Sequence, residues 1–257
     1  MLITTKPSSP ILLVIPAYRE SERLPEFLAN LCKEASGSGL PIKIRLVDDG
    51  SGKQEADKMR ALLSRLQPQF ACLENATYLT QNTGKGGAVY AGWDTAGNGN
   101  FQWLAFVDAD GAVSPQETIR VLGQAAELPV ERKICIWAVR VREAGTKIRR
   151  TFLRSILGNI FRLLVKFTFN LPVRDTQCGL KCIPAEAYTQ IRHHLVEKRF
   201  VFDVELCTQL VRAGFSIREN PISWSESSGS TLNIKSALRM LFSLIGVRWR
   251  MLKQPRP

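Results

Sequence analysis

Short apolar runs alternate with amphipathic stretches along the first half of the chain. The runs contain few polar residues, so each predicts a strand buried in a sheet; they lie at residues 11–15, 42–47, 78–80, 103–107 and 134–139. Between them, apolar residues recur every three or four positions, which predicts helices at 22–34, 54–66, 87–96 and from Ser114 onward. Alternation of this kind predicts an α/β fold, with a mostly parallel sheet flanked by helices.

The second half contains two long segments that combine apolar and basic residues. Around the first, at 152–169, basic residues and one glycine recur every four positions from Arg150 to Lys166, which places them on one stripe of a helix. The second, at 234–252, has a basic stripe and a broad apolar side. Such helices either lie in a membrane interface or pack on a domain and extend their charges into water. Two of them in one basic protein favour the interface. The predicted division is an N-terminal tail at 1–10, a domain at 11–232 and a basic amphipathic C-terminal helix at 233–257.

The charge of the chain indicates an anionic partner. It has 257 residues and a net charge of +12, which is typical of proteins that bind nucleic acid, phosphorylated substrates or acidic membrane surfaces. Six cysteines and two histidines show no metal-ligand spacing, which argues against a zinc site. Scattered cysteines suit a reducing cytosol. Residues 1–10 lack the apolar core of a signal peptide, and no apolar run reaches the ~18 residues of a transmembrane helix. We therefore expect a cytoplasmic protein.

Polar clusters follow four of the predicted strands. Because parallel sheets bind ligands at the carboxyl ends of their strands, these clusters are expected to form one site. They are Pro16, Tyr18 and Glu20; Asp48 and Asp49; Gln81 to Gly87; and Asp108 with Asp110.

The chemistry of these clusters suits a phosphorylated ligand and a metal ion. Asp108 and Asp110 are two positions apart, so in a strand they point to the same side and present the oxygen ligands that Mg²⁺ or Mn²⁺ prefers. The alternative is a pair of solvated turn aspartates. The run from Gly84 to Gly87 allows close backbone approach and carries the cation of Lys85, which suits a pyrophosphate. It lacks the spacing of a P-loop or a dinucleotide-binding motif. The carboxylates after the second strand could accept hydrogen bonds from a nucleoside.

The motifs together resemble a known enzyme family. Ile15-Pro16-Ala17-Tyr18, Val47-Asp48-Asp49-Gly50-Ser51, Asn82-Thr83-Gly84-Lys85-Gly86-Gly87-Ala88 and Asp108-Ala109-Asp110-Gly111 resemble the successive motifs of inverting, nucleotide-sugar-dependent family 2 glycosyltransferases of the GT-A fold. Three later segments resemble dolichyl-phosphate β-glucosyltransferases, whose mannosyl relatives share the overall plan. These are Arg174-Asp175-Thr176-Gln177-Cys178-Gly179-Leu180-Lys181, Phe202-Asp203-Val204-Glu205-Leu206, and Trp224-Ser225-Glu226 with Gly229-Ser230.

The resemblance implies a hexosyltransferase with a nucleotide-sugar donor and a polyprenyl phosphate acceptor. UDP-glucose is the favoured donor and GDP-mannose the alternative. Asp108 and Asp110 would lie at the metal and the donor pyrophosphate. The nucleotide would be lined by Pro16, Tyr18, Glu20, Asp48 and Lys85, with Asp49 beside them. The acceptor phosphate would be positioned by Arg140, Arg150 and Arg154. Asp175 would be a base or a sugar ligand unless it simply pairs with Arg174, and Gln177 and Asp203 would lie at or next to the sugar.

Some residues depart from the family pattern and leave the donor open. Arg19 stands where family members usually have Asn, Ala138-Val139-Arg140 replaces the usual Gly-Ser-Arg, and Ala112 replaces the polar metal ligand of some mannosyl relatives. The N-terminal membrane helix of eukaryotic glucosyl enzymes is not seen. A family 2 transferase with a non-lipid acceptor is a second interpretation, which the basic amphipathic helices disfavour. A nucleic-acid-binding protein is a third, which leaves the aspartates unexplained. The favoured interpretation is a peripheral enzyme on the cytosolic face of an anionic membrane.

Overall fold

A seven-stranded sheet forms the centre of the computed structural model, which describes residues 10–97, 100–141, 143, 145–149, 152–225 and 234–254. The side chains of residues 149, 152–157 and 234–239 lie outside this description. The strands follow the spatial order β3-β2-β1-β4-β7-β5-β8. Their bounds are β1 Ile11–Ala17, β2 Ile42–Asp48, β3 Thr77–Tyr78, β4 Trp103–Val107, β5 Ile134–Val139, β7 Leu180–Pro184 and β8 Ser216–Pro221. All neighbours pair in parallel except β7, which is antiparallel to both β4 and β5. The predicted α/β fold with a mostly parallel sheet is confirmed.

The predicted strands match the observed ones closely, with one exception. The strand predicted at 78–80 is instead the two residues Thr77–Tyr78. Tyr78 pairs with Asp48, the last residue of β2, so no partner strand remains for the residues that follow. The sheet core explains the agreement elsewhere, because β1 and β4 are buried on both faces and therefore read as continuous apolar runs.

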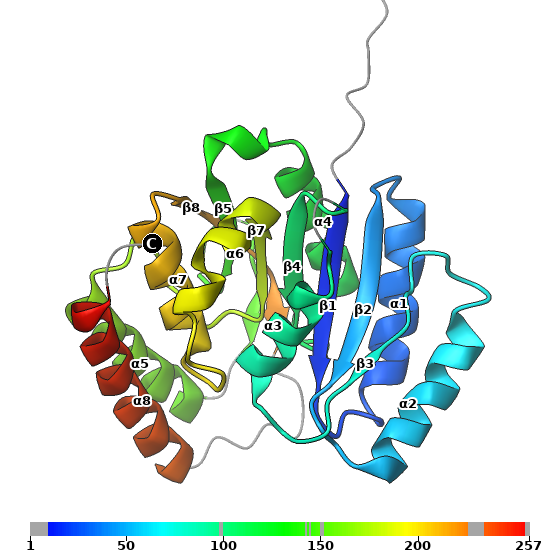
Figure 1. Cartoon of the computed structure of the whole chain (residues 1–257), viewed down its shortest axis with the longest axis horizontal. Helices are drawn as coiled ribbons and strands as arrows, with labels where there is room; N and C mark the ends of the chain where they lie inside the picture. The colour runs from blue at the N-terminus through cyan, green and yellow to red at the C-terminus, as the bar shows by residue number, and fades with distance from the viewer. Residues whose placement is uncertain are drawn as a thin grey trace, which may run out of the picture.

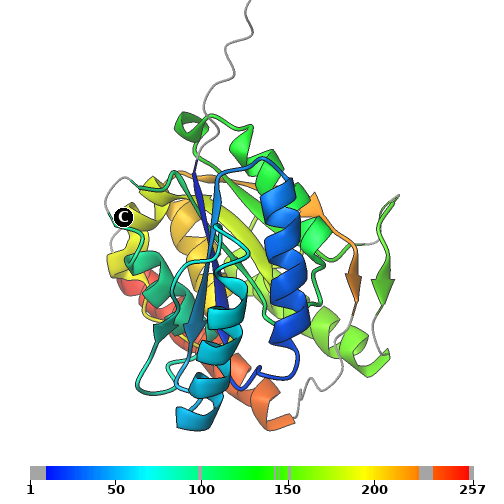
Figure 2. The same ribbon diagram turned by 90° about the vertical axis from the view of Figure 1, so that its right-hand side faces the viewer.

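Helices cover both faces of the sheet (Figures 1 and 2). Helices α1 Leu24–Gly37, α2 Lys53–Leu66 and α4 Pro115–Ala126 pack on the face that carries Leu13 and Ile15. Helices α3 Lys85–Asp94, α6 Ala185–Ile191 and α7 Phe202–Arg212 pack on the opposite face with Leu12 and Val14. Ser114 caps α4 as its sequence predicts, since its hydroxyl accepts the backbone N–H of Glu117 at 3.2 Å.

The two basic amphipathic segments are helices that lie side by side at one end of the sheet (Figure 1). They are α5 Phe152–Phe169 and α8 Ile234–Lys253. A separate apolar cluster joins Val165 of α5 and Leu244 and Val247 of α8 to Val201 and Val204 at the start of α7. A small parallel pair, β6 Ile148–Arg149 and β9 Trp224–Ser225, lies outside the main sheet. Among the described residues, no helix is both long enough and apolar enough to cross a bilayer.

Candidate active site

The candidate site lies at the sheet edge where β1, β2 and β4 end, which is the lower edge in Figure 1. Because β7 runs in the opposite direction, the residues that precede it reach this same edge. The backbone N–H of Asp108, just after β4, donates to the carbonyl of Gly179, just before β7, at 2.9 Å. The structure thus brings together the motifs that follow three strands and the segment that precedes a fourth.

Asp108 contacts the lysine of the glycine-rich loop. Nζ of Lys85, at the start of α3, lies 2.6 Å from Oδ1 of Asp108 and within 5.1 Å of the centre of the Phe106 ring. Burial alone would lower the pKa of Lys85, but the carboxylates of Asp108, Asp203 and Asp110 outweigh it, and the net pKa is raised. Lys85 is therefore a fixed positive charge beside the carboxylate pair, at the N-terminus of a helix where anions are favoured.

Asp110 and Glu20 lie close enough to Asp108 for their charges to affect one another. The pKa of Asp110 is raised, first by burial and then by the negative charge of Asp108. The pKa of Glu20 is also raised by burial, against the effect of Arg23 and with a contribution from Asp110 and Asp108. Like charges held together in this way favour a divalent cation, so the residues present fit Mg²⁺ or Mn²⁺. In the described part of the chain, no group of three His, Cys, Asp or Glu side chains forms a metal site by itself.

Asp49 shapes the glycine-rich loop. Its Oδ1 accepts the backbone N–H of Thr83 at 2.7 Å and the Thr83 hydroxyl at 2.8 Å, and its Oδ2 accepts the side-chain amide of Asn82 at 3.0 Å and the N–H of Gly84 at 2.8 Å. These four bonds use the hydrogen-bonding capacity of a carboxylate. The structure gives this buried residue the role of ordering residues 82–84, and its predicted place beside the nucleotide stays a prediction.

The other predicted nucleotide residues lie at the ends of β1 and β2. Pro16 lies opposite Val47 in the register of these strands, and the buried Asp48 accepts the N–H of Ser51 at 3.4 Å. Tyr18 is 41% exposed, and the guanidinium of Arg19 lies over its ring at 5.1 Å. These side chains surround the edge at which the carboxylates converge, and their contact with a nucleotide stays a prediction.

Arg140 and Asp175 form a buried ion pair. Nε and Nη2 of Arg140 lie 2.7 and 2.9 Å from the two carboxylate oxygens of Asp175, and the backbone N–H of Arg140 donates to the same carboxylate at 3.0 Å. Burial alone would raise the pKa of Asp175, but Arg140 holds it well below its usual range. A carboxylate so stabilised as an anion is a poor proton acceptor. The role of Asp175 as a base or a sugar ligand stays a prediction, and this ion pair disfavours the base.

The alternative pairing of Asp175 with Arg174 is wrong. Arg174 instead contacts two other carboxylates, since its guanidinium lies 2.9 Å from Glu143 and 2.6 Å from Glu219. The neighbour in sequence is therefore not the neighbour in space.

A second buried ion pair, between Lys181 and Asp203, lies close to the site. Nζ of Lys181, in β7, is fully buried and lies 2.6 Å from Oδ1 of Asp203, in α7, and the field of Asp203 also reaches Lys85. Asp203 is 3% exposed, and its predicted place at or next to the sugar stays a prediction. Gln177 lies nearer the edge, where its amide donates to the carbonyl of Phe200 at 3.0 Å. Sequence reasoning gave no role to Lys181, although it ends the segment 174–181 that carries the resemblance and is a lysine inside the apolar run 180–184.

Gly179 was also missed, although it is required for the position of Asp108. A Cβ at residue 179 would lie 2.3 Å from Oδ2 of Asp108, a distance that real atoms do not adopt. We expect Gly179→Ala to displace this carboxylate and to lower kcat about a hundredfold, because misplaced catalytic groups lose orientation. Steady-state kinetics with a thermal melt measure both effects. The exposed Gly37 at the end of α1, whose Cβ would meet nothing, provides the matched control Gly37→Ala. Equal kinetics in both variants would contradict the assignment.

Two predicted acceptor residues cannot be placed. Arg150 lies outside the described residues, and Arg154 lies on α5, but its side chain is outside the description. Their contact with an acceptor phosphate stays a prediction. The third, Arg140, lies near the site edge with its guanidinium held by Asp175 and 5.4 Å from the centre of the Trp224 ring.

Comparison with known proteins identifies the family. The family model for glycosyl transferase family 2 matches residues 12–188. The dolichyl-phosphate β-glucosyltransferase of Dictyostelium discoideum is 30% identical over 250 residues, with coverage of 93% of this chain and 74% of the relative. The enzyme of the same name from Drosophila melanogaster is 31% identical over 234 residues, with coverage of 88% and 70%. The one from Homo sapiens is 29% identical over 259 residues, with coverage of 97% and 78%.

Solved structures show the same fold. The glucosyl-3-phosphoglycerate synthase of Mycobacterium tuberculosis, in complex with Mn²⁺, uridine diphosphate and phosphoglyceric acid, superposes with a TM-score of 0.68 at 13% identity, covering 93% of this chain and 77% of that one. A mannosyltransferase of Pyrobaculum calidifontis, in complex with GDP-Man and Mn²⁺, gives 0.64 at 15% identity, covering 99% and 67%. The fold is thus GT-A, as the motifs indicate. With this fold, the matched family model and relatives that align along most of their length, the chain belongs to glycosyl transferase family 2.

Proposed function

We propose that this glycosyltransferase moves glucose from a nucleotide sugar to a polyprenyl phosphate of the dolichyl type, with inversion at the sugar. The observation that carries the proposal is the cluster of Asp108, Asp110, Glu20 and Lys85 at the sheet edge. The relatives named dolichyl-phosphate β-glucosyltransferase support the choice of sugar and acceptor.

The donor is bound, in this proposal, between the ends of β1 and β2 and the glycine-rich loop. Lys85 and the N-terminus of α3 hold the pyrophosphate, and Pro16, Tyr18 and Asp48 line the nucleotide. UDP-glucose is the proposed donor, because the named relatives are glucosyltransferases and a structural neighbour binds uridine diphosphate. GDP-mannose is the alternative, since another neighbour binds GDP-Man.

Asp108 and Asp110 would hold the divalent cation, with Glu20 close enough to add to their field. Bound Mg²⁺ or Mn²⁺ would neutralise the charge that develops on the departing nucleoside diphosphate. Lys85 adds a second positive charge beside it. Mg²⁺ usually completes its shell with substrate phosphates and water, which suits a site that has too few protein ligands by itself.

The acceptor phosphate needs positioning more than deprotonation, because it is already an anion at neutral pH. Arg140 is proposed to supply the positive field at the site edge, and Asp175 to hold its guanidinium in place. Arg150 and Arg154 are proposed to contact the phosphate directly, since Arg forms forked hydrogen bonds with it.

The outer sides of α5 and α8 are proposed to contact an anionic membrane, on its cytosolic face. Large apolar side chains there are between 37% and 83% exposed; they are Ile160, Leu163, Leu164, Phe167, Leu241, Phe242, Ile245, Trp249 and Leu252. The inner sides pack on the protein, as one of the two sequence-based alternatives predicts, and the membrane contact of the outer sides is the proposal. An exposed apolar surface of this kind marks an interaction site, and aromatic residues with lysine and arginine suit a lipid interface. The division into a domain at 11–232 and a helix at 233–257 belongs to this proposal.

A donor panel tests the proposed function. The protein is incubated with Mg²⁺, polyprenyl phosphate in mixed micelles and radiolabelled UDP-glucose or GDP-mannose, and the lipid is then extracted. We expect label in the organic phase with UDP-glucose and polyprenyl phosphate, and none with the matched polyprenol that lacks the phosphate. Label that stays in a water-soluble product, or that enters lipid only from GDP-mannose, would contradict the proposal.

A further inference from the structure

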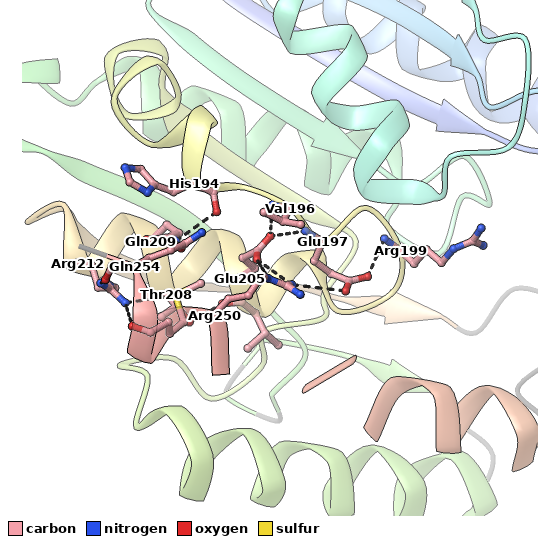
Figure 3. Close-up of polar contacts among 12 residues, drawn as sticks. His194, Val196, Glu197, Arg199, Glu205, Thr208, Gln209, Arg212, Arg250 and Gln254 are labelled. Atoms are coloured by element: carbon pink, nitrogen blue, oxygen red, sulfur yellow. Dashed lines mark hydrogen bonds and ion pairs between the residues drawn. The ribbon is translucent and has the colours of Figure 1, made fainter. Parts of the chain in front are cut away.

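A polar network connects helix α8 to the glycine-rich loop, and none of its members belongs to the site described above. Figure 3 shows its residues, which come from α7, from α8 and Gln254 directly after it, and from the segment 194–199 between α6 and α7. The outer side of α8 carries exposed apolar residues, and the far end of the network lies against the loop that holds Lys85. The network therefore spans the distance between the proposed membrane surface and the proposed donor site.

The segment 196–199 forms one wall of the glycine-rich loop. The backbone N–H of Gly87 donates to the carbonyl of Lys198 at 3.0 Å. A Cβ at Gly84 would lie 2.6 Å from that carbonyl oxygen and 2.8 Å from Cγ of Arg199. The glycine-rich loop thus contacts this segment closely at Gly84 and Gly87, on either side of Lys85. A shift of the segment would therefore move the loop.

Glu205 of α7 holds the segment in place. Its side chain is fully buried, and its Oε2 accepts the backbone N–H groups of Val196 at 2.7 Å and Glu197 at 2.6 Å. Glu197 in turn accepts the N–H of Arg199 at 3.0 Å, which closes the turn (Figure 3). A buried carboxylate costs free energy unless it is paired, so the position of Glu205 requires a cation.

That cation comes from α8. Nη2 and Nε of Arg250 lie 3.0 and 3.3 Å from Oε1 of Glu205, and Nη2 lies 3.9 Å from Glu197 (Figure 3). The end of α8 is fastened to α7 as well, because Arg212 donates to the carbonyls of Met251 at 2.6 Å and Gln254 at 2.7 Å. The guanidinium that neutralises Glu205 is therefore available only while α8 is docked.

We propose that Arg250 and Glu205 are positioning residues that couple contact between α8 and a lipid surface to the shape of the donor-phosphate loop. A surface that holds α8 against α7 stabilises the state in which residues 196–199 support Gly84 and Gly87. Coupling between two sites is reciprocal, so nucleotide binding strengthens vesicle binding by the same factor. The proposal rests on the proposed function for the identity of its two ligands.

The test is a thermodynamic cycle with Mg²⁺-UDP and vesicles of phosphatidylcholine with phosphatidylserine. The Kd for UDP is measured with and without saturating vesicles, and the Kd for vesicles with and without saturating UDP. We expect both to change by the same factor in the wild type, about fivefold or more. Arg250→Met, which keeps the apolar stem, should reduce this factor to one. Arg248→Met removes the same charge from an exposed position of the same helix and should retain it.

Further measurements separate this coupling from a purely structural role and from the reaction itself. Vesicles should slow amide hydrogen exchange in residues 195–200 and 84–88 of the wild type and of Arg248→Met, but not of Arg250→Met. If Arg250→Met fails to fold, Glu205→Gln and the milder Arg250→Lys replace that variant. No exchange response in the wild type, or an unchanged coupling factor in Arg250→Met, would overturn the proposal. A coupled protein that transfers no glucose to polyprenyl phosphate would overturn the proposed function and leave the coupling intact.

Discussion

Asp110→Asn is expected to lower kcat by about a thousandfold while the protein remains folded. The substitution keeps the size of the side chain and removes one of the carboxylates proposed to hold the metal. A metal ion contributes several kcal/mol to the stabilisation of developing charge, and about 1.4 kcal/mol corresponds to a factor of ten in rate. Glucose transfer to extracted lipid gives the rate, and titration with Mn²⁺ followed by electron paramagnetic resonance gives the affinity for the metal.

Asp57→Asn provides the control, because this aspartate is 54% exposed on α2 and pairs only with Arg60 among the described residues. Since the pKa values of Asp110 and Glu20 are raised, protons compete with the metal for these carboxylates above the ordinary pH range of Asp and Glu. Higher Mg²⁺ should therefore move the acid limb of the pH–rate profile to lower pH. Full activity of Asp110→Asn, or of the wild type in EDTA, would exclude this metal site.

Asp175→Asn is expected to reduce the free energy of unfolding by about 3 kcal/mol, because it leaves the guanidinium of Arg140 without its carboxylate in a buried place. The lowered pKa of Asp175 means that the pair stabilises the fold above the ordinary pKa of aspartate, and that this contribution is lost as the pH falls toward the folded-state pKa. Urea denaturation at neutral and acidic pH measures the free energy of unfolding and tests both expectations. The difference from wild type should shrink in acid.

The surface pair of Asp57 and Arg60 again supplies the comparison. Both side chains are 54% exposed, so Asp57→Ala should change the stability by less than about 1 kcal/mol. A loss of that small size in Asp175→Asn would show that the buried pair contributes little to the fold. Its role would then be limited to the orientation of Arg140.

Five of the seven strands of the main sheet could be predicted, because each of these carries its own apolar pattern, whereas the mostly polar strand β8 could not be predicted. The strand β7 could not, because Lys181 interrupts its apolar run and a lysine is rarely buried. Its burial depends on Asp203, which lies on another element and gives no local signal. The antiparallel direction of β7 could not be predicted either. The contact between Gly179 and Asp108, which depends on this direction, was therefore not predicted.

The candidate site shows the same division between local and distant information. The sequence alone predicts that Asp108, Asp110 and Lys85 lie at one edge of the sheet, because the carboxyl ends of parallel strands meet there. It could not distinguish the roles of Asp48 and Asp49, since adjacent aspartates look alike until the loop that one of them binds is known. Arg140 and Asp175 likewise lie on separate segments, and only the fold shows that they form one unit.

The direction in which the strands of the sheet run also determines where a reporter group can be attached. The turn between α4 and β5 lies at the end of the sheet opposite to the candidate site, and Glu131 within it is exposed. Of the six native thiols, five are buried and Cys72 is partly buried. A cysteine in place of Glu131 would therefore offer a far more accessible thiol than any native one. A fluorophore there would follow the arrival of the protein at vesicles from the side that faces away from the candidate site.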